Sequence, residues 1–135
     1  MLKADILLIG CIINDTVIHV PRLFPAIFFE TETGREPVRE WLQDLPKAER
    51  KIIGVDIMTV QFRWPPGMPL VRNIGSGIHE IRSTLPTRIA RTLFFVHEGE
   101  MVLLHGFIKK TRKTPNEDRA LALRRKNAYI KSSKT

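Results

Sequence analysis

Residues 77–110, GIHEIRSTLPTRIARTLFFVHEGEMVLLHGFIKK, contain three short runs rich in β-branched, aromatic and aliphatic residues. Each run has the length of a strand, and Pro86 and Gly99 mark the turns between them. A further run of this kind, PLVRNI at residues 69–74, comes just before. Because consecutive strands with tight connections pair in antiparallel fashion, the stretch predicts a β-meander.

The residues before the meander predict one more strand and two helices. AIFFETET, residues 26–33, is typical of a strand, and a glycine closes it. Helices are expected over residues 35–46 and from about Lys47 to Phe62, where prolines follow and stop the second helix. The apolar residues of each helix share one face: Val38, Trp41, Leu42 and Leu45 in the first, and Ile53, Ile57 and Val60 in the second. We therefore expect an α+β fold in which a helical hairpin packs on an antiparallel sheet.

The end of the chain predicts a basic helix. Thr114-Pro115-Asn116-Glu117 has the Thr-x-x-Glu form of a capping box, with proline in the first helical position. The segment EDRALALRRKNAYIKSS, residues 117–133, then continues as a cationic helix. Its expected packing residues are Ala120, Leu121, Leu123, Ala128 and Ile130.

The positive charge is concentrated in this last part of the sequence. The net charge is +8, yet residues 1–104 contain twelve Lys/Arg and twelve Asp/Glu, whereas residues 105–135 contain ten Lys/Arg and two acids. A cationic end on a neutral body suits a polyanionic partner, either nucleic acid or an acidic protein segment that masks the same surface. The alternative is a solvated basic helix that keeps the protein in solution.

The length of 135 residues fits one domain, expected over residues 26–135, with residues 1–25 as an added strand or a loosely attached extension. The apolar run Ile6 to Ile13 is too short to span a membrane. Cys11 is the single cysteine, so an internal disulfide is excluded and a reducing, cytoplasmic setting is expected. No Cys/His spacing resembles a zinc site.

Alternation along the strands puts arginines on faces that also carry apolar residues. Arg82 shares a face with Glu80, and on the next strand Arg91 shares a face with Leu93 and Phe95. Burying an arginine without a partner is costly. Arg91 is therefore either paired across the sheet, for example with Glu80, or it faces an open groove.

The last strand of the meander carries a histidine and ends in lysines. Alternation places His105 with Leu103 and Phe107, and Lys109 and Lys110 follow. Cleavage of RNA without a metal needs a base for the 2′-hydroxyl, an acid for the leaving oxygen and cations around the phosphorus. A neutral histidine with several Lys and Arg could supply all three, although a lone histidine on an apolar strand is more often a core residue. The sequence contains no cluster of metal-ligand residues that would indicate a metal nuclease. It contains no glycine-rich phosphate loop that would indicate a nucleotide enzyme.

Five segments in this order resemble the phage-related HigB-type toxins of the RelE/ParE superfamily. They are TGREPVREWLQDLP, GMPLVRNIGSGIHEIRS, RIARTLFFV, VLLHGFIKKTRKTP and ALALRRK, and the resemblance covers residues 26–131. It implies a RelE-like fold and a type II toxin–antitoxin system. In such a system the toxin cleaves mRNA on the ribosome without a cofactor, and a HigA-like helix-turn-helix antitoxin neutralises it, in some cases within a heterotetramer.

The resemblance also assigns roles to residues. Arg82 matches the arginine of the family's "ElR" strand near the scissile phosphate, Lys110 belongs to the basic pair after the last strand, and His105 is the candidate acid or base. These three form the expected catalytic set. The expected nucleic-acid-binding residues are Arg91, Lys109, Arg112, Lys113, Arg124 and Arg125.

Two other functions fit the same sequence. ParE-like relatives inhibit DNA gyrase and perform no chemistry, so the fold alone does not select RNA as the target. A phage-derived module that binds nucleic acid or a partner through the basic helix, without catalysis, is the second alternative.

Overall fold

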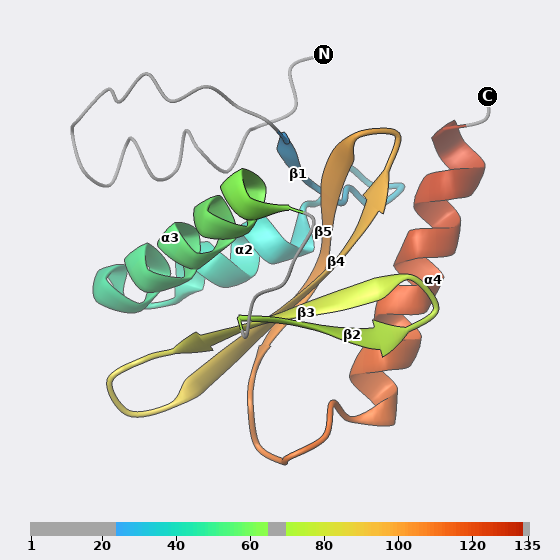
Figure 1. Cartoon of the computed structure of the whole chain (residues 1–135). Helices are drawn as coiled ribbons and strands as arrows, with labels where there is room; N and C mark the ends of the chain where they lie inside the picture. Colours follow the sequence, from blue (N-terminus) through green and yellow to red (C-terminus); the bar gives the residue numbers. More distant parts are fainter. Residues whose placement is uncertain (1–23, 65–69, 134–135) are drawn as a thin grey trace.

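The computed structural model describes residues 24–64 and 70–133 (Figure 1). Part of the predicted N-terminal extension and of the proline-rich turn lies outside these residues. The elements along the chain are β1 (Ala26–Phe28), α2 (Pro37–Asp44), α3 (Lys47–Arg63), β2 (Val71–Gly75), β3 (Ile78–Thr84), β4 (Ile89–His97), β5 (Glu100–Ile108) and α4 (Asn116–Ser133). The fold is α+β, as predicted.

The described strands form one five-stranded sheet in the order β1-β5-β4-β3-β2. Strands β2 to β5 form the predicted antiparallel meander. The prediction of a wholly antiparallel sheet is wrong, because β1 pairs with β5 in parallel. A parallel pair needs a long crossover, and the two helices and three strands between β1 and β5 supply it.

The first strand is shorter than predicted. It ends at Phe28, whereas the sequence suggested residues 26–33. Thr31 N–H donates to the Arg35 carbonyl at 2.7 Å, and Gly34 N–H donates to the Thr31 carbonyl at 2.9 Å. The chain turns here before α2, and Gly34 adopts a φ of 85°, which favours glycine.

Helices cover both faces of the sheet (Figure 1). The α2–α3 hairpin packs on one face, and its predicted stripe of Ile53, Ile57 and Val60 is completely buried. Helix α4 packs on the other face through Ala122, Tyr129 and Ile130. Of the residues predicted to pack from this helix, Ala120, Leu123 and Ala128 are exposed instead. The reason is the phase of the helix, because the residues that contact the sheet, such as Asp118, Ala122, Arg125 and Tyr129, recur every three or four positions.

A β-bulge in β5 changes which residues face α4. Leu93 pairs with His105 and Phe94 pairs with Leu103, so Leu104 has no partner residue on β4 within the described sheet. Leu103 therefore packs with the helical hairpin, whereas Leu104 packs under α4. The prediction that His105 shares a face with Leu103 is wrong, because the bulge adds one residue to the alternation.

Candidate nucleic-acid interface

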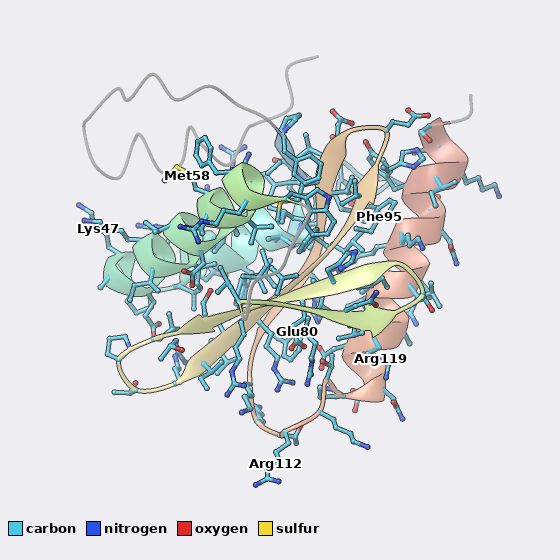
Figure 2. The ribbon with its side chains drawn as sticks, viewed as in Figure 1. Lys47, Met58, Glu80, Phe95, Arg112 and Arg119 are labelled. Atoms are coloured by element: carbon cyan, nitrogen blue, oxygen red, sulfur yellow. The ribbon has the colours of Figure 1, made fainter. Side chains whose placement is uncertain are left out.

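The cationic end of the sheet lies on the α4 face, where β5 ends and the chain turns towards α4. Arg82 of β3 lies opposite Arg91 of β4, and Arg91 lies opposite Phe107 of β5. Residues 109–114 then form a connection that we call the cationic loop. Figure 2 shows Arg112 of this loop pointing away from the sheet, whereas Glu80 lies between the sheet and the start of α4.

A buried ion pair lies beneath the loop. The side chains of Arg91 and Glu80 are only 1% and 3% exposed, and Arg91 Nε lies 3.6 Å from Glu80 Oε1. Arg91 also donates from Nη2 to the carbonyl of Arg112 at 2.6 Å. Of the two interpretations of Arg91, pairing across the sheet is therefore the one found. An open groove at Arg91 is not found, and a guanidinium this deeply buried has no surface for direct contact with a phosphate in this conformation.

Glu80 has two further partners. Arg72 of β2 donates to Glu80 Oε1 at 3.3 Å, and the hydroxyl of Thr114 donates to Glu80 Oε2. The predicted capping box is wrong, because among the described residues no bond joins the Glu117 N–H to the Thr114 hydroxyl oxygen, and the helix begins at Asn116. The sequence placed Glu80 on the same face as Arg82, but nothing in it indicated Thr114 as a partner.

Most of the side chains open to solvent at this end are cationic. Arg82, Lys110, Arg112 and Lys113 are exposed, and Lys109 is partly exposed. Lys109 N–H donates to the Ile89 carbonyl at 2.7 Å, which continues the pairing of β4 and β5.

The pKa of Lys109 reflects the local electrostatic potential. Partial burial lowers the pKa of Lys109, and the positive charges of Arg82, Arg91 and Arg112 lower it further, whereas Glu80 opposes them. A lysine among three arginines with one carboxylate nearby lies in a strongly positive potential. A phosphate group is the kind of ligand that such a potential attracts.

His105 lies apart from this cluster. Its Nε2 is 2.6 Å from Asp118 Oδ1 of α4, its ring stacks on Phe107 with 5.3 Å between centroids, and its side chain is 16% exposed. Burial lowers the pKa of His105, and Asp118 partly opposes this effect. Lys110 follows five residues later, about 16 Å along an extended chain. The structure thus brings Lys109 close to Arg82 and Arg112 and places His105 against α4.

Most of the basic residues that face the sheet from α4 bind the protein's own backbone. Arg125 Nη1 donates to the carbonyl of Leu104, the bulge residue, at 2.8 Å. Arg119, labelled in Figure 2, donates to the Ile74 carbonyl at 2.6 Å, and Lys126 donates to the Ser76 carbonyl. Arg124 is exposed. Of the two arginines of α4 predicted to bind nucleic acid, only Arg124 presents an uncommitted guanidinium.

Neither a metal centre nor a membrane span is found in residues 24–64 and 70–133. No three His, Cys, Asp or Glu residues of this part come together as metal ligands. None of its helices combines the length and the apolar character that crossing a membrane requires.

Comparison with protein families places these features in a known group. Residues 40–127, about two thirds of the chain, match the family described as phage derived protein Gp49-like (DUF891). The chain belongs to this Gp49-like family. The matched region runs from α2 into α4 and includes the whole cationic loop. The Gp49-like family belongs to the RelE/ParE-like toxin superfamily, which agrees with the α+β fold found here. No curated protein matches the chain.

Proposed function

We propose that this Gp49-like protein is the toxin of a type II toxin–antitoxin system, of the HigB kind, and that it cleaves mRNA on the ribosome without a metal ion. The observation that carries the proposal is the cationic loop beside Arg82, within a family of the RelE/ParE-like superfamily. A HigA-like helix-turn-helix antitoxin would neutralise it, in a complex such as a heterotetramer, in the cytoplasm. Ribosomal RNA and mRNA are the polyanions that the loop would contact.

The chemistry required is an in-line attack of the ribose 2′-oxygen on the adjacent phosphorus. The 2′-O–P bond forms and the P–O5′ bond breaks, which yields a 2′,3′-cyclic phosphate and a free 5′-hydroxyl. One proton leaves the 2′-hydroxyl and another reaches O5′. Exposed guanidinium and ammonium groups such as Arg82, Lys110 and Arg112 would stabilise the charge that develops on the phosphorane oxygens.

Proton transfer needs a group that changes its protonation state near neutral pH. His105 was the candidate from the sequence, yet its Nε2 is held by Asp118 under α4. Lys109 is better placed, because it lies beside Arg82 and Arg112 and its pKa is lowered. A lysine with a lowered pKa is a more effective proton acceptor at neutral pH than an ordinary one. Within this proposal Lys109 is the candidate proton acceptor by its position beside the exposed cations.

Expression in cells tests the proposal. The double variant Arg82→Ala/Lys110→Ala removes two exposed charges from the site and should abolish both growth arrest and new mRNA 5′ ends. Lys47→Ala/Lys51→Ala removes two exposed charges from α3, on the opposite face of the sheet, and should remain toxic. Equal arrest by both double variants, or intact mRNA during arrest, would show that this is not a ribonuclease toxin acting through the site.

Measurements of DNA supercoiling distinguish the ribonuclease proposal from the gyrase alternative. Plasmid supercoiling is measured in the arrested cells and with the purified protein and gyrase. A ribonuclease leaves supercoiling unchanged, whereas a ParE-like inhibitor lowers it and leaves mRNA intact. A non-catalytic binding module would give neither effect.

A further inference from the structure

We propose that Glu80 and Arg91 are positioning residues, which set the conformation of the cationic loop from inside the sheet. Only the consequence of this inference rests on the proposed function. If the loop binds RNA, then RNA binding depends on two residues that do not contact RNA.

The loop has little of its own to hold it in one conformation. It carries Lys109, Lys110, Arg112 and Lys113, and like charges at such short spacing repel one another. Its internal side-chain bond runs from the Thr111 hydroxyl to the Lys113 carbonyl, at 2.6 Å. A conformation that keeps these cations together therefore needs support from outside the loop.

Two side chains of the sheet support the loop beyond its first residue. Arg91 Nη2 binds the carbonyl of Arg112 in the middle of the loop at 2.6 Å, and Glu80 accepts the hydroxyl of Thr114 at its end. Because Arg91 holds the Arg112 carbonyl inwards, the Arg112 side chain points to solvent, as Figure 2 shows. The two anchoring side chains are joined to each other at 3.6 Å. Both come from interior strands of the sheet, β3 and β4, and both are buried.

Stability of the core does not account for this pair. Burying an ion pair costs desolvation energy, and apolar residues of similar volume serve a core at least as well. Two rows further along the same face, the cross-strand pair Ile78 and Phe95 is apolar and buried. Moreover, Nε and Nη1 of Arg91 have no hydrogen-bond partner among the residues that the structure describes. The bond that Arg91 does complete is the one to the loop, which indicates that holding the loop is its role.

Native-state proteolysis with trypsin measures the loop directly, without RNA. Trypsin cleaves after Lys and Arg, and the loop offers such sites at residues 109–113 once it opens. Glu80→Gln removes the charge while keeping the shape. Glu49→Gln is the matched control, because Glu49 also binds an arginine, Arg88 of the β3–β4 turn, through bonds of 2.9 and 2.6 Å. Mass spectrometry of the first fragments identifies the cleavage sites, and thermal denaturation gives the stability of each variant.

We expect cleavage within the loop to be about tenfold faster in Glu80→Gln than in Glu49→Gln at matched distance below each melting temperature. Replacing the carboxylate by a neutral amide weakens the charge-assisted contacts of residue 80 with Arg91 and Thr114, and a weakening of about 1.4 kcal/mol gives that factor. Equal cleavage rates in the two variants would overturn the inference. Thr114 provides a second comparison that spares the buried pair. Thr114→Ser keeps the hydroxyl and should retain the slow cleavage, whereas Thr114→Val should show the fast one. Fast cleavage in both Thr114 variants would also overturn it.

RNA binding by the same proteins separates this inference from the proposed function. The probe is a short, end-labelled single-stranded oligoribonucleotide. Faster loop cleavage together with weaker RNA binding in Glu80→Gln supports both proposals. Faster loop cleavage with unchanged RNA binding supports the positioning role and shows that RNA binds elsewhere.

Discussion

Gly106 of β5 lies directly beneath the indole of Trp41 from α2. A Cβ at this position would lie 2.2 Å from Cε3 of Trp41, far inside van der Waals contact. The backbone of Gly106 is not in the left-handed region, so space alone requires the glycine. The α2–β5 contact therefore depends on a missing side chain.

Gly106→Ala should lower the free energy of unfolding by about 1–3 kcal/mol, the usual cost of overpacking a core. Denaturant unfolding followed by tryptophan fluorescence measures it. Gly54→Ala in α3 is the control, because nothing lies within 4 Å of its added Cβ, and it should stabilise the protein by about 0.5–1 kcal/mol. If Gly106→Ala is as stable as the natural protein, Trp41 does not pack on this glycine.

His79 and His105 both make stability depend on pH. Burial lowers the pKa of each histidine below 6.5, and nearby Lys126 adds to the effect at His79. The unfolded chain therefore takes up protons more readily than the folded protein as the pH falls through this value. The free energy of unfolding therefore falls as the pH drops below the pKa of histidine in the unfolded chain. Well above that pKa the two histidines do not change it.

We expect the free energy of unfolding to fall between about pH 7 and pH 5, and His105→Gln to make this fall shallower. Glutamine can still donate a hydrogen bond to Asp118, so the carboxylate keeps a partner at neutral pH. The measurement is urea unfolding across this pH range. An unchanged pH slope in His105→Gln would show that the proton equilibrium of His105 does not differ between the folded and unfolded states.

Helix α4 is attached to the sheet by polar contacts as well as by its apolar residues. Arg125 binds the carbonyl of the bulge residue Leu104 and lies over the ring of Phe29, 5.9 Å from its centroid. The bulge removes Leu104 from the β4 pairing, and the helix supplies the donor that its carbonyl would otherwise lack. The carbonyl that the bulge in β5 leaves unpaired thus accepts a hydrogen bond from a side chain of α4.

Arg125→Met should therefore destabilise the protein by about 1–3 kcal/mol, because it leaves a partly buried carbonyl without its charged donor. Arg124→Met, its neighbour on the exposed side, should change stability by less than about 0.5 kcal/mol. Thermal and denaturant unfolding of the two variants give the comparison. Equal losses in both would contradict the assigned role of Arg125.

The regular elements could be predicted from sequence because they depend on local periodicity. The stripe Ile53, Ile57 and Val60 and the strands of the meander follow from spacing alone. The bulge at Leu104 and the Thr114–Glu80 bond could not, since each depends on a partner distant in sequence. Among the site residues, the cluster around Lys109 followed from charge density. The contact of His105 with Asp118 did not, since Asp118 comes from another element, helix α4.

The excess positive charge of the chain serves two purposes. Arg119, Arg125 and Lys126 bind carbonyl groups of the sheet, so part of the charge holds α4 in place. The cationic loop and Arg82 present the charge that is open to solvent at the end of the sheet. The expected contrast is therefore between residues whose loss affects folding and residues whose loss affects the binding of a polyanion.

Salt dependence of RNA binding measures the second group. For a single strand, the slope of log K against log salt concentration changes by about 0.7 for each phosphate contact. Lys110→Ala and Lys113→Ala should each make the slope shallower by about this amount and leave the melting temperature unchanged. Lys51→Ala on α3, which is also exposed but lies across the sheet, should change neither quantity. If Lys51→Ala lowers the slope as much as the loop variants do, RNA responds to the net charge of the protein and not to the loop. A slope that falls only in the loop variants would establish that the phosphates bind at this end of the sheet.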